Sequence, residues 1–103
     1  MNSEKKRKTA NLLSVCIKAG KTVKGFDSAK TAVTEGKAYA VLAASDSSEK
    51  TVKEICFVCR KYNVPVLMTE LEKAEIGKLV GKDTAIIAVC DNGFADGFRK
   101  ILD

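Results

Sequence analysis

Apolar side chains near the start of the chain recur every three or four positions, which is the period of a helix with one buried face. This face consists of Leu12, Leu13, Cys16 and Ile17. Gly20 stands where a helix commonly ends, and we therefore predict a first helix over residues 5–19. The basic cluster Lys5–Lys8 opposes the dipole at the start of this helix. We interpret it as a solvated terminus, with an arm that touches phosphates as the alternative.

Four short apolar runs follow, and each is separated from the next by a segment with helical periodicity. We predict strands over residues 21–24, 38–44, 64–68 and 84–89. The second and fourth include the runs AYAVLAA and TAIIAV, which are typical of strands covered on both faces. One helix followed by alternating strands and helices predicts an α/β fold, with helices on both faces of a small sheet. We find no repeat or linker, so residues 1–103 are interpreted as one domain.

Polar cap residues indicate where the helices begin. The second helix is expected from about Asp27 to Glu35. Asp46 with Glu49, and Thr69 with Glu72, have the spacing of capping boxes at the starts of the third and fourth helices. The third helix is expected to end near residue 61, and the fourth to end at the glycine in position 81.

Two segments with glycine require a choice. Gly77, inside the fourth predicted helix, costs about 1 kcal/mol against alanine, so we expect another backbone to approach it closely. The segment Asp91–Gly93 contains Asn-Gly, which is typical of a hairpin turn. The apolar residues after it have helical period and no strand follows, so we predict a fifth helix. These residues are Phe94, Phe98, Ile101 and Leu102.

The balance of charge favours a polyanionic partner. The 103 residues carry a net charge of +5, with a pI near 9.1. Nucleic acid is the commonest partner of a small basic domain, and the alternative is that lysine only keeps the domain soluble. No apolar run approaches the roughly 20 residues of a membrane span. The basic start MNSEKKRK also lacks the apolar region of a signal peptide, so we expect a cytoplasmic protein with no membrane partner.

Cys56 and Cys59 form a CxxC pair, a spacing that zinc sites and redox proteins use. A zinc site needs four ligands, but the chain has no histidine, and Cys16 and Cys90 stand alone on apolar segments. A redox pair sits at a helix start, whereas this pair falls in the middle of the third predicted helix. We therefore interpret both thiols as small core residues, and we expect no metal and no cofactor.

Catalytic patterns are not found in the sequence. Carboxylates are plentiful, but none forms a pair that stands out from the solvated helix faces. Neither a phosphate-binding glycine motif nor a nucleophile elbow is present. The sequence therefore gives no support to an enzyme.

The stretch KTVKGFDSAK, residues 21–30, is the strongest candidate for a binding site. A short strand turns at Gly25 into the second helix, and Lys21, Lys24 and Lys30 surround this junction. A helix start presents unpaired N–H groups and the positive end of the helix dipole. Such a position suits a phosphate. The alternative is an ordinary strand-to-helix turn that needs glycine for its backbone conformation.

Five segments carry a resemblance to a known superfamily. They are AGKTVKGFDSA (19–29), GKAYAVLAASD (36–46), CRKYNVPV (59–66), IGKLVGK (76–82) and AVCDNGFA (88–95). In this order and spacing, the chain resembles the kink-turn-binding ribosomal proteins of the L-seven-Ae and L-thirty-e type, and most closely their small bacterial YlxQ-like members. The resemblance covers nearly the whole chain and implies a three-layer α/β/α sandwich with a four-stranded mixed sheet. It also implies binding to structured RNA, with ribosomal RNA and the ribosome as partners.

In that superfamily, the start of the second helix and the loop before the fourth helix hold the RNA. The helix start there has glycine, any residue, asparagine, glutamate, two further residues and then lysine. In this chain the glycine is Gly25, but Asp27, Ser28 and Thr31 replace the other three, and Lys30 lies about 100° around the helix from the lysine position. An aspartate only accepts hydrogen bonds and adds negative charge, so we expect weaker reading of bases than in the relatives.

The residues and the resemblance together predict a non-catalytic, monomeric RNA-binding protein. We expect its RNA contacts among Lys21, Lys24, Gly25, Phe26, Asp27, Ser28, Lys30, Thr31, Leu71, Glu72 and Lys73. Phe26 is in phase with Ala29 and Val33, so we expect it to pack the helix onto the sheet rather than to stack on a base. The alternative function is a protein-binding scaffold that has lost specific RNA recognition.

Overall fold

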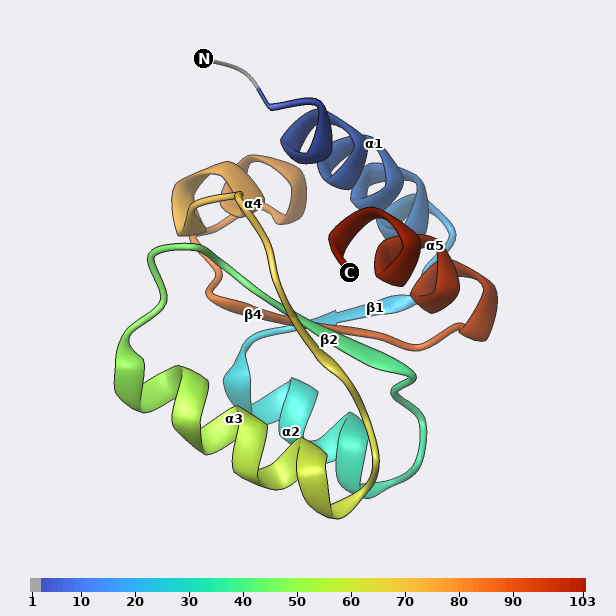
Figure 1. Cartoon of the computed structure of the whole chain (residues 1–103), viewed down its shortest axis with the longest axis vertical. Helices are drawn as coiled ribbons and strands as arrows, with labels where there is room; N and C mark the ends of the chain where they lie inside the picture. Colours follow the sequence, from blue (N-terminus) through green and yellow to red (C-terminus); the bar gives the residue numbers. More distant parts are fainter. Residues whose placement is uncertain (1–2) are drawn as a thin grey trace.

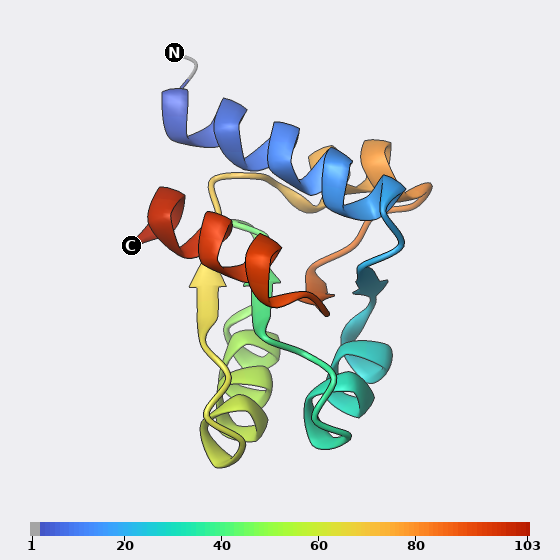
Figure 2. The same cartoon turned by 90° about the vertical axis from the view of Figure 1, so that its right-hand side faces the viewer.

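A computed structural model describes residues 3–103 and shows one sheet between two layers of helices (Figure 1). The elements are α1 (Glu4–Lys18), β1 (Thr22–Lys24), α2 (Phe26–Thr34), β2 (Ala40–Ala43), α3 (Glu49–Lys61), β3 (Val66–Met68), α4 (Lys73–Val80), β4 (Ile86–Val89) and α5 (Asn92–Leu102). Helices α1, α4 and α5 cover one face of the sheet, and α2 and α3 cover the other (Figures 1 and 2). The predicted α/β/α sandwich is confirmed.

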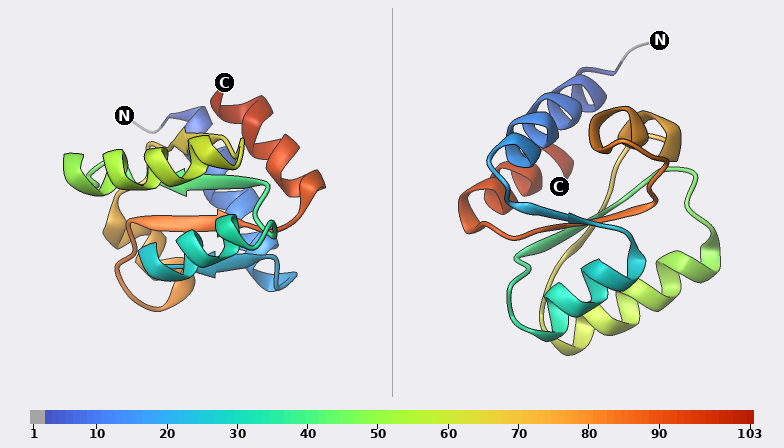
Figure 3. Two further views of the ribbon diagram at one scale, coloured as in Figure 1. Left: turned by 90° about the horizontal axis from the view of Figure 1, so that it is seen from below. Right: turned by 180° about the vertical axis from the view of Figure 1, so that it is seen from behind.

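The sheet has four strands in the order β1-β4-β2-β3. β4 is antiparallel to both of its neighbours, whereas β2 and β3 are parallel, so the sheet is mixed as predicted. Figure 3 shows β4, in orange, lying between the blue β1 and the green β2. The last strand in the chain therefore fixes the position of the first strand, and with it the start of α2.

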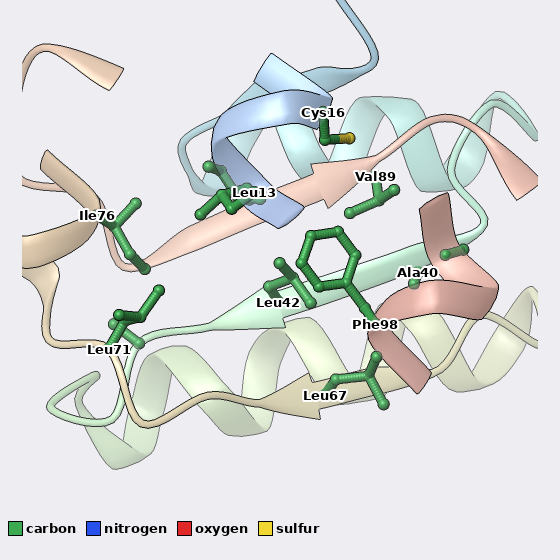
Figure 4. Close-up of a cluster of buried hydrophobic side chains, with 12 residues drawn as sticks. Leu13, Cys16, Ala40, Leu42, Leu67, Leu71, Ile76, Val89 and Phe98 are labelled. Atoms are coloured by element: carbon green, nitrogen blue, oxygen red, sulfur yellow. The ribbon is translucent and has the colours of Figure 1, made fainter. Parts of the chain in front are cut away.

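The two central strands are buried along their whole length. Alternate side chains of a strand point to opposite faces of the sheet. On one face, Leu42 and Val89 pack with Leu13 of α1 and Phe98 of α5 (Figure 4). The opposite face packs a second cluster, which includes Ala29, Val33, Val41, Ile55, Cys59, Ile86 and Ala88. The prediction that AYAVLAA and TAIIAV contain strands covered on both faces is thus confirmed.

Three of the predicted strands begin two residues too early. They were expected from residues 38, 64 and 84, and the strands begin at residues 40, 66 and 86. Ala38 and Thr84 are buried although they lie outside the strands, with exposed fractions of 7% and 5%. The apolar pattern indicates which residues are buried and not which residues form hydrogen bonds to a neighbouring strand. It therefore includes buried residues that precede the strand.

The predicted capping box at the start of α3 is wrong. α3 begins after Ser48, whose hydroxyl oxygen accepts the N–H of Thr51 at 3.1 Å. Asp46 instead accepts the N–H of Lys73 at 2.8 Å, which joins the loop after β2 to the start of α4. Several adjacent polar residues could cap this helix. Asp46 does not, because its carboxylate binds the start of α4 instead.

The second predicted capping box is also wrong. The buried Thr69 hydroxyl donates to the carbonyl of Ala43 at 3.0 Å, so it joins β3 to β2 rather than capping a helix. The cap of α4 is Glu72, whose N–H donates to the carboxylate of Glu75 at 2.9 Å. The sequence placed the same kind of box three residues too early.

The fifth helix is present as predicted, and the hairpin alternative is excluded. Asp91 precedes α5, and its carboxylate accepts the N–H of Phe94 at 2.9 Å. The Asn-Gly pair that is typical of hairpins therefore forms the first turn of a helix.

The basic cluster at the N-terminus forms the first turns of α1. Lys5, Arg7 and Lys8 are exposed, as expected for a solvated terminus. Lys6 is half-buried, and its ammonium lies 2.7 Å from the carboxylate of Glu75 in α4. No helix in the described part of the chain has the length and apolar character needed to cross a membrane.

Candidate nucleic-acid interface

The junction between β1 and α2 turns at Gly25, whose backbone has φ 95° and ψ 153°. Essentially only glycine adopts this conformation. Beyond its chain neighbours, no described atom lies within 4 Å of the position that a Cβ would take, so the requirement is conformational rather than spatial. The Gly25 N–H donates to the carbonyl of Ile86 at 2.8 Å, which ties the turn to β4. The backbone therefore holds the start of α2 in a defined place against the sheet.

The start of α2 is open. The first helical hydrogen bond runs from the N–H of Ala29 to the carbonyl of Gly25 at 2.9 Å. No side chain within residues 3–103 caps this helix, and the N–H groups of Phe26, Asp27 and Ser28 have no partner in that range. These groups carry the partial positive charge of the helix start, so they can bind an anion.

A groove of about 710 Å³ runs beside this junction. We name it the junction groove, and its principal residues are Lys24, Gly25, Asp27, Ser28, Val80 and Lys82. One wall comes from β1 and the first turn of α2, and the other comes from the end of α4 and the residues after it. The described residues that line the groove include two lysines and a single carboxylate, so its charge favours an anion.

Lys24 joins the two walls of the junction groove. Its ammonium donates to the carbonyl of Val80 at 2.7 Å. That carbonyl belongs to the last turn of α4 and has no helical partner to bind. An ammonium group has three donors, so Lys24 keeps two for a ligand while it holds the end of α4 in place.

The residues that follow α4 pack tightly against it. A Cβ on Gly77 would lie 2.8 Å from the backbone nitrogen of Asp83 and 2.9 Å from the carbonyl carbon of Lys82. The close backbone approach expected at this glycine is therefore present. It places Lys82 at the rim of the junction groove, opposite the start of α2.

A second groove, of about 550 Å³, lies on the other side of α2. Thr31, Lys37 and Cys90 line it together with Asp27 and Ser28. Asp27 and Ser28 thus face both grooves, as expected for residues in the first turn of an open helix. Thr31 lies one turn further along α2 and faces only the second groove.

The predicted contact residues divide into two groups. Lys24 and the predicted residues of α2 lie around one helix start, and Lys30 is exposed one turn into that helix. Lys21 is exposed but precedes β1, at the opposite end of that strand from Gly25, and it lines neither groove. Phe26 packs against the core cluster beneath α2, as expected, and remains half-exposed.

The segment Leu71–Lys73 lies elsewhere, at the opposite end of α4 from the junction groove. Leu71 is 3% exposed and belongs to the core. The N–H groups of Glu72 and Lys73 bind Glu75 and Asp46. The end of α4, with Val80 and Lys82, takes the place beside α2 that the sequence assigned to this segment.

The two cysteines of the CxxC pair differ in burial. Cys56 is half-buried and lies outside both core clusters, so the prediction of a core position is confirmed for Cys59 alone. Cys59 is buried in the core, and burial raises the pKa of its thiol to about 11. Burial raises the pKa of the Cys16 thiol to about 11 as well (Figure 4). Such thiols are protonated at neutral pH and are weak nucleophiles and metal ligands. Within residues 3–103, no group of three or more metal-ligating side chains comes together.

The sequence matches the Ribosomal protein L7Ae/L30e/S12e/Gadd45 family over residues 7–98. It is 30% identical to the RNA-binding protein YlxQ of Enterococcus faecium over 103 residues, which cover 100% of this chain and 99% of that protein. It is 33% identical over 93 residues to the RNA-binding protein YlxQ of Bacillus subtilis (strain 168), with 89% and 92% of the two chains covered.

Solved structures share the same fold. A protein of unknown function from Bacillus halodurans superposes with a TM-score of 0.83 at 26% identity, over 89% of this chain and 93% of that one. The 15.5kD RNA binding protein of Giardia lamblia superposes with a TM-score of 0.78 at 20% identity, over 98% and 87% of the two chains.

Proposed function

We propose that this chain, which belongs to the Ribosomal protein L7Ae/L30e/S12e/Gadd45 family, is a non-catalytic RNA-binding protein that holds kink-turn-like RNA at the start of α2. Its YlxQ relatives match almost its whole length and are named RNA-binding proteins, which supports RNA as the ligand. Association with the ribosome or another ribonucleoprotein is part of this proposal.

One observation carries the proposal: three backbone N–H groups open into a groove that lysines flank on both sides. Phosphate oxygens are the natural acceptors for such donors, and Lys24 and Lys82 neutralise further phosphates. The site lies between two separate walls, one from β1 and α2 and the other from the end of α4. A groove of this kind fits a bent polynucleotide better than a single phosphate group.

Recognition of bases is expected to be weaker than recognition of shape. Asp27 and Ser28 occupy the positions where the family pattern has asparagine and glutamate, and Thr31 occupies the lysine position. Asp27 can accept hydrogen bonds from bases but cannot donate to them. Phosphate contacts position a protein on nucleic acid, and base contacts specify the sequence. The protein should therefore prefer kinked RNA while tolerating changes in its sequence.

The test is a titration of the protein with two labelled RNAs of equal length, followed by fluorescence anisotropy. One RNA is a plain duplex, and the other carries tandem G·A pairs beside a three-nucleotide bulge. We expect the bent RNA to bind tighter by roughly tenfold, which is about 1.4 kcal/mol. Both affinities should fall steeply as salt rises, because binding releases counterions from the phosphates.

Equal affinity for the two RNAs would contradict kink recognition while leaving phosphate binding intact. The loss of the asparagine, glutamate and lysine favours a second candidate function, a scaffold that binds protein. If neither RNA binds at low salt, this scaffold function replaces the RNA-binding one.

A further inference from the structure

Phe57 is a large aromatic side chain that the fold leaves in solvent. It is 60% exposed in the middle of α3. The core side of α3 carries Ile55 and Cys59, and Phe57 lies between them in sequence, so it points to the opposite side of the helix. The ring therefore contributes little to the core, which leaves its apolar face available to a partner.

A groove of about 300 Å³ between α2 and α3 lies beside this ring. We name it the helical groove, and it is lined by Phe26, Lys30, Lys53, Glu54, Phe57 and Val58. Phe26 lines both this groove and the junction groove. The two grooves are therefore neighbours that meet at Phe26, at the start of α2.

The charges around Phe57 are mostly positive. Lys30 and Lys53 line the helical groove, and the ammonium of Lys61 lies 4.5 Å from the centroid of the Phe57 ring. Two carboxylates are also present: that of Glu54 lies 3.9 Å from the exposed ammonium of Lys50, and that of Glu49 lies 4.0 Å from the ammonium of Lys53. An aromatic platform among lysines matches a ligand that combines a flat apolar part with negative charge, which is the chemistry of a nucleotide.

We propose that the helical groove binds an unpaired nucleotide adjoining the folded RNA, with its base stacked on Phe57 and its phosphates beside Lys30 and Lys53. The inference rests on the proposed function, because the junction groove must first hold the RNA. The base displaces the flexible Lys61 side chain from the ring, since an exposed cation–π contact is weaker than base stacking on an aromatic side chain. This assigns a role to Lys30, which lies one residue before the position of the family lysine and faces this groove instead.

The test compares two forms of the tandem G·A duplex, one with blunt ends and one with a six-uridine single-stranded tail, in anisotropy titrations at low salt. Two tailed RNAs are used, one with the tail at each end of the duplex. In the native protein the tail should tighten binding by roughly tenfold, as expected for one or two stacked bases. Phe57→Ala should remove this gain and leave the affinity for the blunt duplex unchanged. Phe57→Leu, which keeps an apolar side chain without a ring, should also remove it, and Phe57→Trp should retain it.

The matched control is Tyr39→Ala, which removes another exposed aromatic ring, 49% exposed, outside both grooves. It should keep the full gain from the tail, and circular dichroism should show that all four variants are folded. A tail that gives no gain, or the same gain in Phe57→Ala as in the native protein, overturns this inference while leaving the proposed function standing. If the blunt duplex itself does not bind, the proposed function fails and the inference fails with it.

Discussion

Reversing two lysine charges on either side of the start of α2, Lys30→Glu with Lys82→Glu, is expected to weaken binding of the tandem G·A RNA with its single-stranded tail by more than about 100-fold at low salt. Each lysine is exposed and stands close to the proposed path of the RNA. Losing two charge-assisted contacts of roughly 1.5–3 kcal/mol each, with repulsion added, gives an effect of this size. The slope of log affinity against log salt should also fall by about 1 for each lysine. Fluorescence anisotropy over a range of salt concentrations measures both effects.

The matched control is Lys8→Glu with Lys100→Glu, which changes the net charge equally. Lys8 and Lys100 are exposed on α1 and α5, across the sheet from α2. Lys82 is a better test than Lys24, because the Lys24 ammonium also donates to the Val80 carbonyl at 2.7 Å and its loss would disturb the fold of the groove. If the two double variants weaken binding to the same extent, the overall charge of the protein governs binding and the site is misplaced.

The substitution Gly77→Ala is expected to destabilise the fold and to displace one wall of the junction groove. The added Cβ would lie 2.8–2.9 Å from backbone atoms of Lys82 and Asp83, which cannot move without shifting the loop after α4. Overpacking of this kind costs about 1–3 kcal/mol, and the better helix propensity of alanine offsets up to about 1 kcal/mol of it. We expect a net loss of about 1–2 kcal/mol in the free energy of unfolding, measured by urea denaturation. RNA affinity should fall as well, because Lys82 moves.

Gly97→Ala provides the comparison, since Gly97 also lies inside a helix. A Cβ there would lie 2.9 Å from Cδ2 of Leu12, the end of a flexible side chain that can rotate away. The gain in helix propensity should then leave Gly97→Ala as stable as the native protein, or slightly more stable. Equal stability of the two variants would show that the contact at Gly77 is not tight.

Much of the fold can be predicted from local patterns. The strands within AYAVLAA and TAIIAV, Ala40–Ala43 and Ile86–Val89, are buried along their whole length because strands covered by helices on both faces have no polar face. After Asp91, the helical period of the apolar residues predicts the structure correctly, and the Asn-Gly pair does not. Periodicity over ten residues indicates a buried helix face, whereas an Asn-Gly pair indicates only that the chain can turn.

The contacts that the sequence misplaced are those between distant segments. Asp46 has the spacing of a local helix cap, but its partner is the N–H of Lys73, 27 residues away. The segment Leu71–Lys73 was expected beside the start of α2, whereas Lys24 bonds to Val80 at the other end of α4, 56 residues away along the chain. Helix caps and loop contacts of this kind depend on which elements become neighbours in the fold. The spacing of residues within one segment of the sequence does not indicate which distant segment will lie beside it.

A ¹H–¹⁵N titration of the protein with the tandem G·A RNA, followed at the backbone amides, tests directly whether the start of α2 holds the RNA. We expect the largest shifts at Phe26, Asp27 and Ser28, because their N–H groups are the open donors of α2. Changes at Lys82 should accompany them, since it stands on the facing wall. Shifts that leave these three amides unchanged and gather instead on α1 and α5 would contradict RNA binding at the start of α2.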